Sequence, residues 1–415
     1  MDKLKRVAQQ IFDEVRQATQ DTQGVSRESF GYAETLALEI IEKWSTQLGL
    51  ITYRDNLQNV WIRRPQDSGK APGVVIGSHA DSVPQGGNYD GLAGIVAGLL
   101  VLAYQQQKSI TPPLPVRTLA LRGEESAWYG KAYVGSLALL GKLDKNELGN
   151  SHRSLDKTLG QAMLECGIDI SMIESARPAI DLESIRAYLE LHIEQGPVMV
   201  ARQWPIAAVT GIRGNIRHAR IRCLGESGHS GAVPRWLRKD SVLAMAELLS
   251  RLDEHWRVLL QMGMDLVMTV GICTTRPETH AVSVIPGEVD FSFEVRSQDN
   301  QTMQQFYQLM QDECERISNS RGVKFVFDRK IETAPARMDE TWTEKLCSAG
   351  SSILGTAMER IPSGAGHDAA VFANAGIPSA MLFVRNANGS HNPHEAMDLD
   401  DFMLGVRTLS EALTS

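Results

Sequence analysis

The chain has 415 residues, of which 43% are hydrophobic and 22% are charged, and its net charge at pH 7 is −8. This composition excludes a largely disordered chain, and the length exceeds what one ordinary hydrophobic core needs, so we expect two domains. The acidic balance and the lack of a basic stripe in the sequence exclude nucleic acid from the expected partners. The longest apolar run, residues 92–104, is too short to span a bilayer, so no membrane partner is expected either.

The N-terminal residues and the cysteines both predict a cytoplasmic protein. Leu4, Val7, Ile11 and Val15 recur at helical spacing, and no apolar signal-peptide core follows them. The five cysteines are scattered without a Cys-x-x-Cys pair, which is typical of free thiols in a reducing compartment.

The next elements along the chain predict an α/β layer. Residues 74–79 form a short apolar run that ends in polar residues, as a buried parallel strand does at the carboxyl edge of its sheet. A helix is expected over residues 92–104 and a second strand over residues 116–121. Because binding sites in open α/β sheets lie beyond the carboxyl ends of strands, the polar residues after these strands are candidates for a site.

The middle of the chain predicts a different module. Its expected elements have the order βαββαβ, which is that of a ferredoxin-like fold. They are strands at residues 216–224, 266–273, 287–295 and 323–327 and helices at residues 240–262 and 301–319. An α/β pattern then resumes with a helix at 341–354, a strand at 379–384 and a helix at 400–413. We therefore predict an α/β domain of residues 1–212 and 329–415 that is interrupted by an inserted domain of residues 213–328.

Three polar segments near the predicted strand ends carry candidate chemistry. His79 and Asp81 share one side of an extended chain, so Asp81 can orient the imidazole of His79 for a metal ion. Glycines flank Asp90 before a helix, and this aspartate is either a metal ligand or a helix N-cap. Glu124 and Glu125 follow a strand, where one carboxylate can bind a cation and the other can accept a proton from water, unless the pair is only a solvated turn.

Two further segments add histidines. Alternation over residues 188–196 places Glu190, His192 and Glu194 on one face of a strand, where a single histidine is more often merely exposed. His391 lies in a polar loop rich in glycine and proline, which is either a surface loop or part of a site. Taken together, the histidines and carboxylates predict a site for two divalent ions, and zinc, manganese, cobalt and nickel all suit these ligands.

These residues stand in motifs that resemble those of the M20 metallopeptidase superfamily, and within it the hydantoinase/carbamoylase amidases. That branch includes N-carbamoyl-L-amino acid hydrolases, allantoate amidohydrolases and β-ureidopropionases. The motifs span nearly the whole chain in the order of the family: GSHADSVPQGGNYDG (77–91), GEES (123–126), ELHIEQGP (190–197), GHSGAVPRWLRKD (228–240), SGAGHDA (363–369) and SHNPHE (390–395). The resemblance implies a zinc-peptidase-like catalytic domain and an inserted lid domain through which two copies form a homodimer.

The resemblance also assigns the metal ligands. It implies that His79 and His192 bind one ion, that Glu125 and His391 bind the other, and that Asp90 bridges both. Suitable residues fill all five positions, so a competent site is expected.

Three more residues match catalytic and substrate-binding positions of the family. Glu124 matches the general base that activates the water between the ions. His229 matches a lid histidine that reaches the active site of the partner subunit and stabilises the oxyanion, and a surface loop histidine is the alternative. Arg296 matches the arginine whose planar fork clamps the substrate carboxylate.

The resemblance connects Gln195, Ser283 and Gly389 with substrate binding and assigns His367 and Asp368 to the wall of the site. Two of these positions depart from the family pattern. Ser283 replaces a residue that is commonly asparagine, and the loop lacks the residue usually found between Gly389 and the following serine. The pocket that contacts the substrate is therefore expected to differ from that of other members.

A third departure follows the catalytic glutamate, where the family commonly reads EEGSRF and this chain reads EESAWY. Trp128 and Tyr129 would make the pocket more aromatic if they line it. The predicted reaction is hydrolysis of the C–N bond of N-carbamoyl-L-amino acids or closely related N-acyl amino acids. Allantoate amidohydrolysis and the hydrolysis of N-acyl amino acids or dipeptides are alternatives, and a non-catalytic metal-binding homologue is the alternative outside enzymes.

Overall fold

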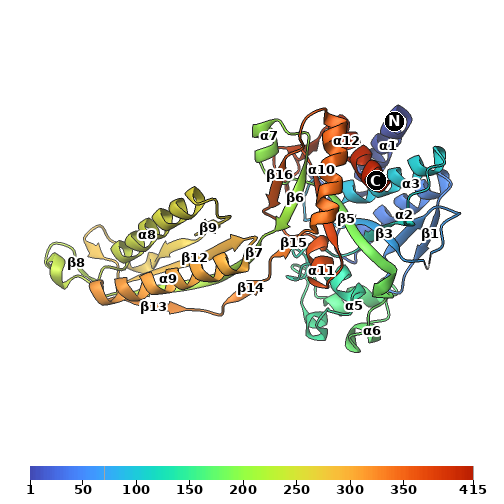
Figure 1. The fold of residues 1–415 in the computed structure, drawn as a ribbon. Coiled ribbons are helices and arrows are strands. Elements are labelled where there is room, and N and C mark those ends of the chain that lie inside the picture. The colour runs from blue at the N-terminus through green and yellow to red at the C-terminus, as the bar shows by residue number, and fades with distance from the viewer. Residues whose placement is uncertain (70, 415) are drawn as a thin grey trace. The chain divides into compact units, whose positions relative to one another are not determined.

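The computed structural model describes residues 1–69 and 71–414, and the chain divides into two compact units (Figure 1). The first unit consists of Met1–Gly211 and Arg337–Ser415, and the second, Ile212–Ala336, is inserted between these parts. Helices and strands are mixed in both units, so the fold is of the α/β type that the sequence predicts.

The first unit contains a nine-stranded sheet with the order β1-β2-β4-β3-β5-β17-β6-β15, in which β16 pairs with β6. Its middle is parallel, because β3 pairs in parallel with β4 and β5, and β17 pairs in parallel with β5. These strands are buried along almost their whole length, as expected for strands covered on both faces. The strands are β1 (Ile51–Arg54), β2 (Val60–Arg63), β3 (Gly73–His79), β4 (Val116–Leu121), β5 (Ile185–Ile193), β6 (Ile206–Ile212), β15 (Ala336–Arg337), β16 (Arg360–Ser363) and β17 (Ser379–Val384).

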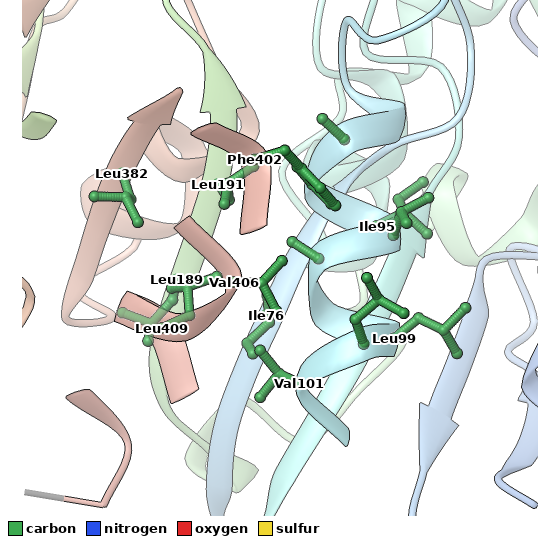
Figure 2. Packing of buried hydrophobic residues seen from close by; sticks show 14 of the residues in the cluster. Ile76, Ile95, Leu99, Val101, Leu189, Leu191, Leu382, Phe402, Val406 and Leu409 are labelled. Atoms are coloured by element: carbon green, nitrogen blue, oxygen red, sulfur yellow. The ribbon is translucent and has the colours of Figure 1, made fainter. Parts of the chain in front are cut away.

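One hydrophobic core joins the five longest helices of the first unit to this sheet. They are α1 (Asp2–Thr19), α2 (Tyr32–Gln47), α3 (Leu92–Gln107), α10 (Glu340–Leu354) and α12 (Leu399–Ala412). Figure 2 shows Leu189 and Leu191 of β5 in this core, beside residues of α3 and α12. Because strand residues alternate between faces, Glu190 and His192 point to the opposite face of the sheet. The shorter helices are α4 (Val134–Leu139), α5 (Leu159–Glu165), α6 (Ser171–Glu174), α7 (Val198–Arg202) and α11 (Asp368–Asn374).

The longest apolar run of the sequence, residues 92–104, lies in helix α3. It is buried almost throughout and packs against β3, β4 and β5. A Cβ atom at Gly94 would lie 2.3 Å from the carbonyl oxygen of Leu191, so glycine allows the helix to approach the sheet closely. The run is therefore apolar because it fills the protein core.

The second unit has a six-stranded antiparallel sheet with the order β10-β12-β7-β13, in which β9 also pairs with β12 and β14 with β7. Helices α8 (Ser241–Gln261) and α9 (Asn300–Arg321) pack against β7 and β12. The alternation predicted for β12 is confirmed, because Val289, Phe291, Phe293 and Val295 are all buried. The strands are β7 (Gly214–Leu224), β9 (Val267–Thr269), β10 (Cys273–Thr275), β12 (Glu288–Ser297), β13 (Lys324–Phe327) and β14 (Ile331–Thr333).

Two sequence-based expectations differ from the structure in this unit. The strand expected at 266–273 is divided into β9 and β10, which pair with different parts of β12. The boundary expected after residue 328 lies too early, because β14 pairs with β7 and so belongs to the second unit. The chain also forms two small ribbons, β8 (Gly228–His229) with β11 (Val284–Ile285) and β18 (Asn386–Ala387) with β19 (Ala396–Met397).

The helices and the cysteines can be compared with the expectations from composition. Among the helices of the described residues, none has the length and apolar character that crossing a bilayer requires. All five cysteines are free thiols, as predicted.

Candidate metal centre

Among the described residues of the first unit, two groups of possible metal ligands share Asp90. His79 at the end of β3, Asp90 before α3 and His192 of β5 form the first group. Asp90, Glu125 after β4 and His391 form the second group. Within each group the ligand atoms all lie within 4.8 Å of one another. The structure therefore brings together the five residues that the sequence proposed as ligands.

The two oxygens of Asp90 face different groups. Its Oδ1 lies 3.0 Å from Nε2 of His192 and 3.7 Å from Nε2 of His79. Its Oδ2 lies 3.1 Å from Nε2 of His391, which is also 3.3 Å from Oε1 of Glu125. One carboxylate thus serves both groups, which is the arrangement that a bridging ligand needs.

Asp81 orients His79 and also holds the turn after β4. Its Oδ1 lies 3.2 Å from Nδ1 of His79, which leaves Nε2 directed at the ligand group. The backbone N–H groups of Glu124 and Glu125 donate to its two oxygens at 3.1 and 3.0 Å. Register places His79 beside Leu121, so β3 and β4 end at the same level and their following residues meet. The role expected for Asp81 agrees with these contacts.

The segment before α3 is held by Glu395, which the sequence reasoning did not select. Oε1 of Glu395 accepts from the backbone N–H groups of Tyr89 and Asp90 at 2.9 and 3.2 Å. Its Oε2 accepts from the hydroxyl of Ser390 at 2.6 Å. The alternative assignment of Asp90 as a helix N-cap is wrong, because the N-cap of α3 is Gly91 and no side chain caps it. The only available signal for Glu395 was its place at the end of the SHNPHE motif.

The charge and burial of the cluster fit divalent cations. His79 and His192 are buried, whereas the side chain of His391 is 49% exposed, so the second group is the accessible one. Hydrogen bonds to Asp90 and Glu125 raise the pKa of His391 to about 11, which shows that these carboxylates favour a positive charge at this position. Imidazole and carboxylate donors in sets of three suit zinc, manganese, cobalt or nickel. The residues therefore fit the metal ions that the motifs implied.

Glu124 stands beside the ligands and belongs to neither group. Its Oε2 lies 3.9 Å from Nε2 of His79, and the residue is 7% exposed. Burial raises the pKa of Glu124 well above its ordinary value. A buried carboxylate of this kind next to ligands can accept a proton from water.

Backbone strain marks the residues on the open side of the cluster. Gln195, Asn388 and His391 have φ angles of 63°, 66° and 59°, in the left-handed region that non-glycine residues rarely adopt. The amide of Gln195 donates to Oδ2 of Asp90 at 3.1 Å, and Gly389 accepts from the side chain of Asn386 at 2.7 Å. Gln195 thus lies at the centre, and Gly389 shapes the loop that carries His391.

His367 and Asp368 lie behind the first group. The ring of His367 is 4.4 Å from that of His192, and burial lowers the pKa of His367 well below its ordinary value. Asp368 accepts from the hydroxyl of Ser136 at 2.5 Å. A third ligand-like group contains Glu190, His192 and His367, but Glu190 already accepts from Ser78 and from the N–H of Ala369.

Trp128 and Tyr129 do not form an exposed aromatic wall. They are 8% and 4% exposed, and both pack against the ring of His152. The indole N–H of Trp128 donates to the carbonyl of Ser82 at 2.8 Å. This departure from the family pattern therefore stabilises the loop after Glu125.

Three of the predicted site residues lie in the second unit. His229 is on β8, where its backbone is paired with Val284, and Ser283 precedes that partner. Arg296 is on β12 and forms an ion pair of 3.0 Å with Glu294. The structure thus places His229 and Ser283 together, and Arg296 on a separate strand of that unit.

Comparison with known proteins identifies the family. The sequence profile of the peptidase family M20/M25/M40 matches residues 75–415. The chain belongs to the M20 peptidase family. This family is metal-dependent, which agrees with the two ligand groups.

Several relatives of the chain carry the names of amidohydrolases. An N-carbamoyl-L-amino acid amidohydrolase from Geobacillus stearothermophilus is 30% identical over 98% of this chain and 96% of its own. An allantoate amidohydrolase from Escherichia coli is 30% identical over 87% of this chain and 85% of its own. A solved structure of a hydantoinase/carbamoylase family amidase from Burkholderia multivorans has a TM-score of 0.87 at 27% identity, covering 99% of this chain and 97% of that one. The resemblance seen in the motifs is confirmed, and this M20 protein is a hydrolase.

Proposed function

We propose that the protein hydrolyses N-carbamoyl-L-amino acids, cleaving the C–N bond to the amino acid nitrogen and releasing the free amino acid, ammonia and carbon dioxide. The observation that carries this proposal is the pair of ligand groups that share Asp90, with the buried carboxylate of Glu124 3.9 Å from His79. The proposal is supported by the N-carbamoyl-L-amino acid amidohydrolase that is 30% identical over nearly the whole chain.

In this proposal the five ligands hold two divalent ions. His79 and His192 would hold one ion, Glu125 and His391 would hold the other, and Asp90 would be shared between them. Two such ions, when bound, acidify a water and stabilise the negative charge that develops on the substrate carbonyl oxygen.

Glu124 is the proposed general base. It takes a proton from the attacking water and returns it to the nitrogen that leaves, so that the amine departs as a neutral group. Its burial among other carboxylates favours the protonated form and so makes it a strong acceptor.

The second unit is proposed to act as a ferredoxin-like lid that completes the site. Nδ1 of His229 accepts from the N–H of Gly231 at 3.1 Å, so the neutral ring carries its proton on Nε2. That N–H is the donor which an oxyanion needs. Arg296 is proposed to bind the substrate carboxylate. The substrate would then take the place of Glu294, with which Arg296 forms an ion pair in the structure.

A homodimer is proposed to form through this same unit. Exposed apolar side chains of the second unit support an interface, because patches of this kind on a protein surface mark association sites. Trp236 and Leu237, which follow β8, are 81% and 53% exposed, and Val282, which precedes the paired strand β11, is fully exposed. In the dimer, His229 would act at the site of the partner subunit.

Allantoate is the second candidate substrate. It is supported by the allantoate amidohydrolase from Escherichia coli, whose identity to this chain is also 30%. N-acyl amino acids and dipeptides are a third class that the same centre could hydrolyse.

The test is to measure the release of ammonia and of free amine by manganese-, cobalt- or zinc-loaded protein. The panel contains N-carbamoyl, N-acetyl and N-formyl L-amino acids, N-carbamoyl-β-alanine, allantoate and dipeptides. Ammonia and free amino acid in equal amounts from N-carbamoyl substrates is the expected result. Ammonia from allantoate alone would support the second candidate, and amine without ammonia would assign the protein to the acylases or peptidases.

A further inference from the structure

A short segment that precedes the matched family region contacts the metal centre. Residues 25–30 lie before residue 75, where the match to the family begins. Val25 and Gly86 exchange two backbone hydrogen bonds of 3.0 and 2.9 Å, and the hydroxyl of Ser29 donates to Asp81 at 2.6 Å. The segment therefore lies directly against the residues that carry and orient the ligands.

Arg27, in the middle of this segment, is completely buried and connects two ligand-bearing stretches. Its Nε donates to the carbonyl of Ala80, the residue after His79, at 2.7 Å. Its Nη1 donates to the side chain of Asn88, two residues before Asp90, at 3.2 Å. One guanidinium group thus bridges the backbone next to His79 and the segment that leads to Asp90.

The surroundings of Arg27 do not compensate the free-energy cost of burying its positive charge. Among the described residues the acceptors of the Arg27 guanidinium are a carbonyl and an amide oxygen and not a carboxylate, and its Nη2 has no hydrogen-bond partner. Burial lowers the pKa of Arg27, and the more distant carboxylates of Glu395 and Asp90 act in the opposite direction. A buried cation without a direct ion-pair partner lowers the stability of the fold, which is expected of a residue placed for function rather than for stability.

We propose that Arg27 is a positioning residue of the metal centre, which holds the chain after His79 and the chain before Asp90 in the relative position that the first ligand group requires. The inference rests on the proposed metal binding. A planar fork with several N–H donors can reach two acceptors at once, whereas the ammonium of a lysine is a single point of attachment.

The charge of Arg27 and its hydrogen bonds predict opposite effects of a substitution. A fixed positive charge near the ligands repels divalent cations, so its removal alone would increase their affinity. Loss of the two hydrogen bonds would let the ligand segments move and would decrease the affinity. The sign of the change therefore distinguishes positioning from a purely electrostatic role.

The experiment measures Zn²⁺ affinity by competition with a chromogenic chelator, in the wild type, Arg27→Met and Arg27→Lys. We expect both variants to bind Zn²⁺ about 10- to 100-fold more weakly, as for other residues that support metal ligands. Tighter binding by Arg27→Met together with unchanged binding by Arg27→Lys would overturn the proposal, because charge would then be the whole effect.

Arg64→Met is the matched control. Arg64 is also buried, at 2% exposure, but it bonds to Asp67 and to the carbonyl of Ile110. We expect this variant to be less stable with unchanged Zn²⁺ affinity, and an equal loss of affinity in both methionine variants would refute a specific role for Arg27.

Asn88→Ala provides a second test if Arg27→Met does not fold, because it removes one acceptor of the guanidinium and keeps the arginine. A several-fold weaker Zn²⁺ affinity is expected, and an unchanged affinity would contradict the proposal. A wild-type protein that binds no Zn²⁺ would overturn the proposed function itself. Wild-type binding with unchanged variants would overturn only the role of Arg27.

Discussion

At the scale of single residues, the adjacent carboxylates of Glu124 and Glu125 differ in their surroundings. Glu125 lies 3.3 Å from Nε2 of His391 and belongs to a ligand group, whereas Glu124 belongs to none. Both backbone N–H groups are held by Asp81, so the turn presents the two side chains in fixed positions. Neighbours in sequence can therefore have separate chemical roles.

This difference predicts different losses in two matched variants. Glu124→Gln should keep its metal and lose about 100-fold or more in kcat, because the proton acceptor is gone. Glu125→Gln should lose bound metal, because an amide is a poorer ligand than a carboxylate. Metal content by atomic emission, together with kcat on the best substrate, distinguishes them, and the reverse pattern would exchange the roles of the two residues.

Gly91 provides a second prediction at this scale. Its φ angle is +67°, and an added Cβ would lie 2.5 Å from Nε2 of His79. Gly91→Ala should therefore displace His79 and weaken Zn²⁺ binding by about 10-fold or more, comparable to other disturbances of ligand position.

Gly130→Ala is the control for backbone strain alone. Gly130 has φ of +71°, and an added Cβ would meet nothing within 4 Å. This variant should lose about 1–2 kcal/mol of stability, measured by denaturant unfolding, and bind Zn²⁺ normally. If both variants bind Zn²⁺ equally well, the close approach of residue 91 to His79 does not affect metal affinity.

At the scale of elements, helix α2 anchors the turn that carries the two glutamates. Glu34 of α2 is completely buried and accepts from Nε of Arg122 at 2.6 Å and from the backbone N–H of Gly123 at 2.8 Å. Arg122 is the first residue after β4, so the ion pair joins a helix to the end of a central strand. The position of the turn thus depends on packing between elements that are distant in sequence.

Glu34→Ala should destabilise the protein by about 3–5 kcal/mol, because it leaves the guanidinium of Arg122 buried and unpaired. Glu42→Ala on the same helix is the control. Glu42 pairs with Arg54, and both side chains are 24% exposed, so this loss should cost about 0–1 kcal/mol. Urea unfolding of both variants measures the difference, and equal losses would show that burial of the Glu34 pair is unimportant.

At the scale of the whole molecule, the proposed active site needs residues from both units. All five proposed ligands and Glu124 belong to the first unit, whereas His229, Ser283 and Arg296 belong to the second. In the proposed homodimer, two copies associate through the second unit. The proposed mechanism therefore predicts that subunits depend on one another.

Mixing His229→Ala with Glu124→Gln subunits tests this dependence. Each variant alone should be nearly inactive. A 1:1 mixture of randomly paired subunits should recover about one quarter of wild-type activity, since half of the dimers are mixed and each has one intact site. No recovery after subunit exchange, with a dimer confirmed by light scattering, would place His229 in its own subunit or outside the site.

The amino-acid sequence was sufficient for the α/β class and for most long elements, and its family motifs proposed five metal ligands, which the structure brings together. The class and the elements follow from local patterns, such as the apolar run at residues 74–79 and the alternation in 289–295, whereas the five ligands were assigned by the resemblance to a family. The divided strand at 266–273 and the strand at 331–333 escaped prediction, because pairing with β12 and β7 defines them and their own residues carry only a weak pattern.

The supports of the ligands became evident only in the folded chain. Glu395 bonds to Asp90 across 305 residues of sequence, and Arg27 and Glu34 reach the site from the N-terminal region. Periodicity reports whether a side chain is buried, but it does not report which distant group that side chain meets. Local patterns and family motifs could therefore point to the candidate metal ligands, whereas long-range packing defines the hydrogen bonds that hold those groups in place.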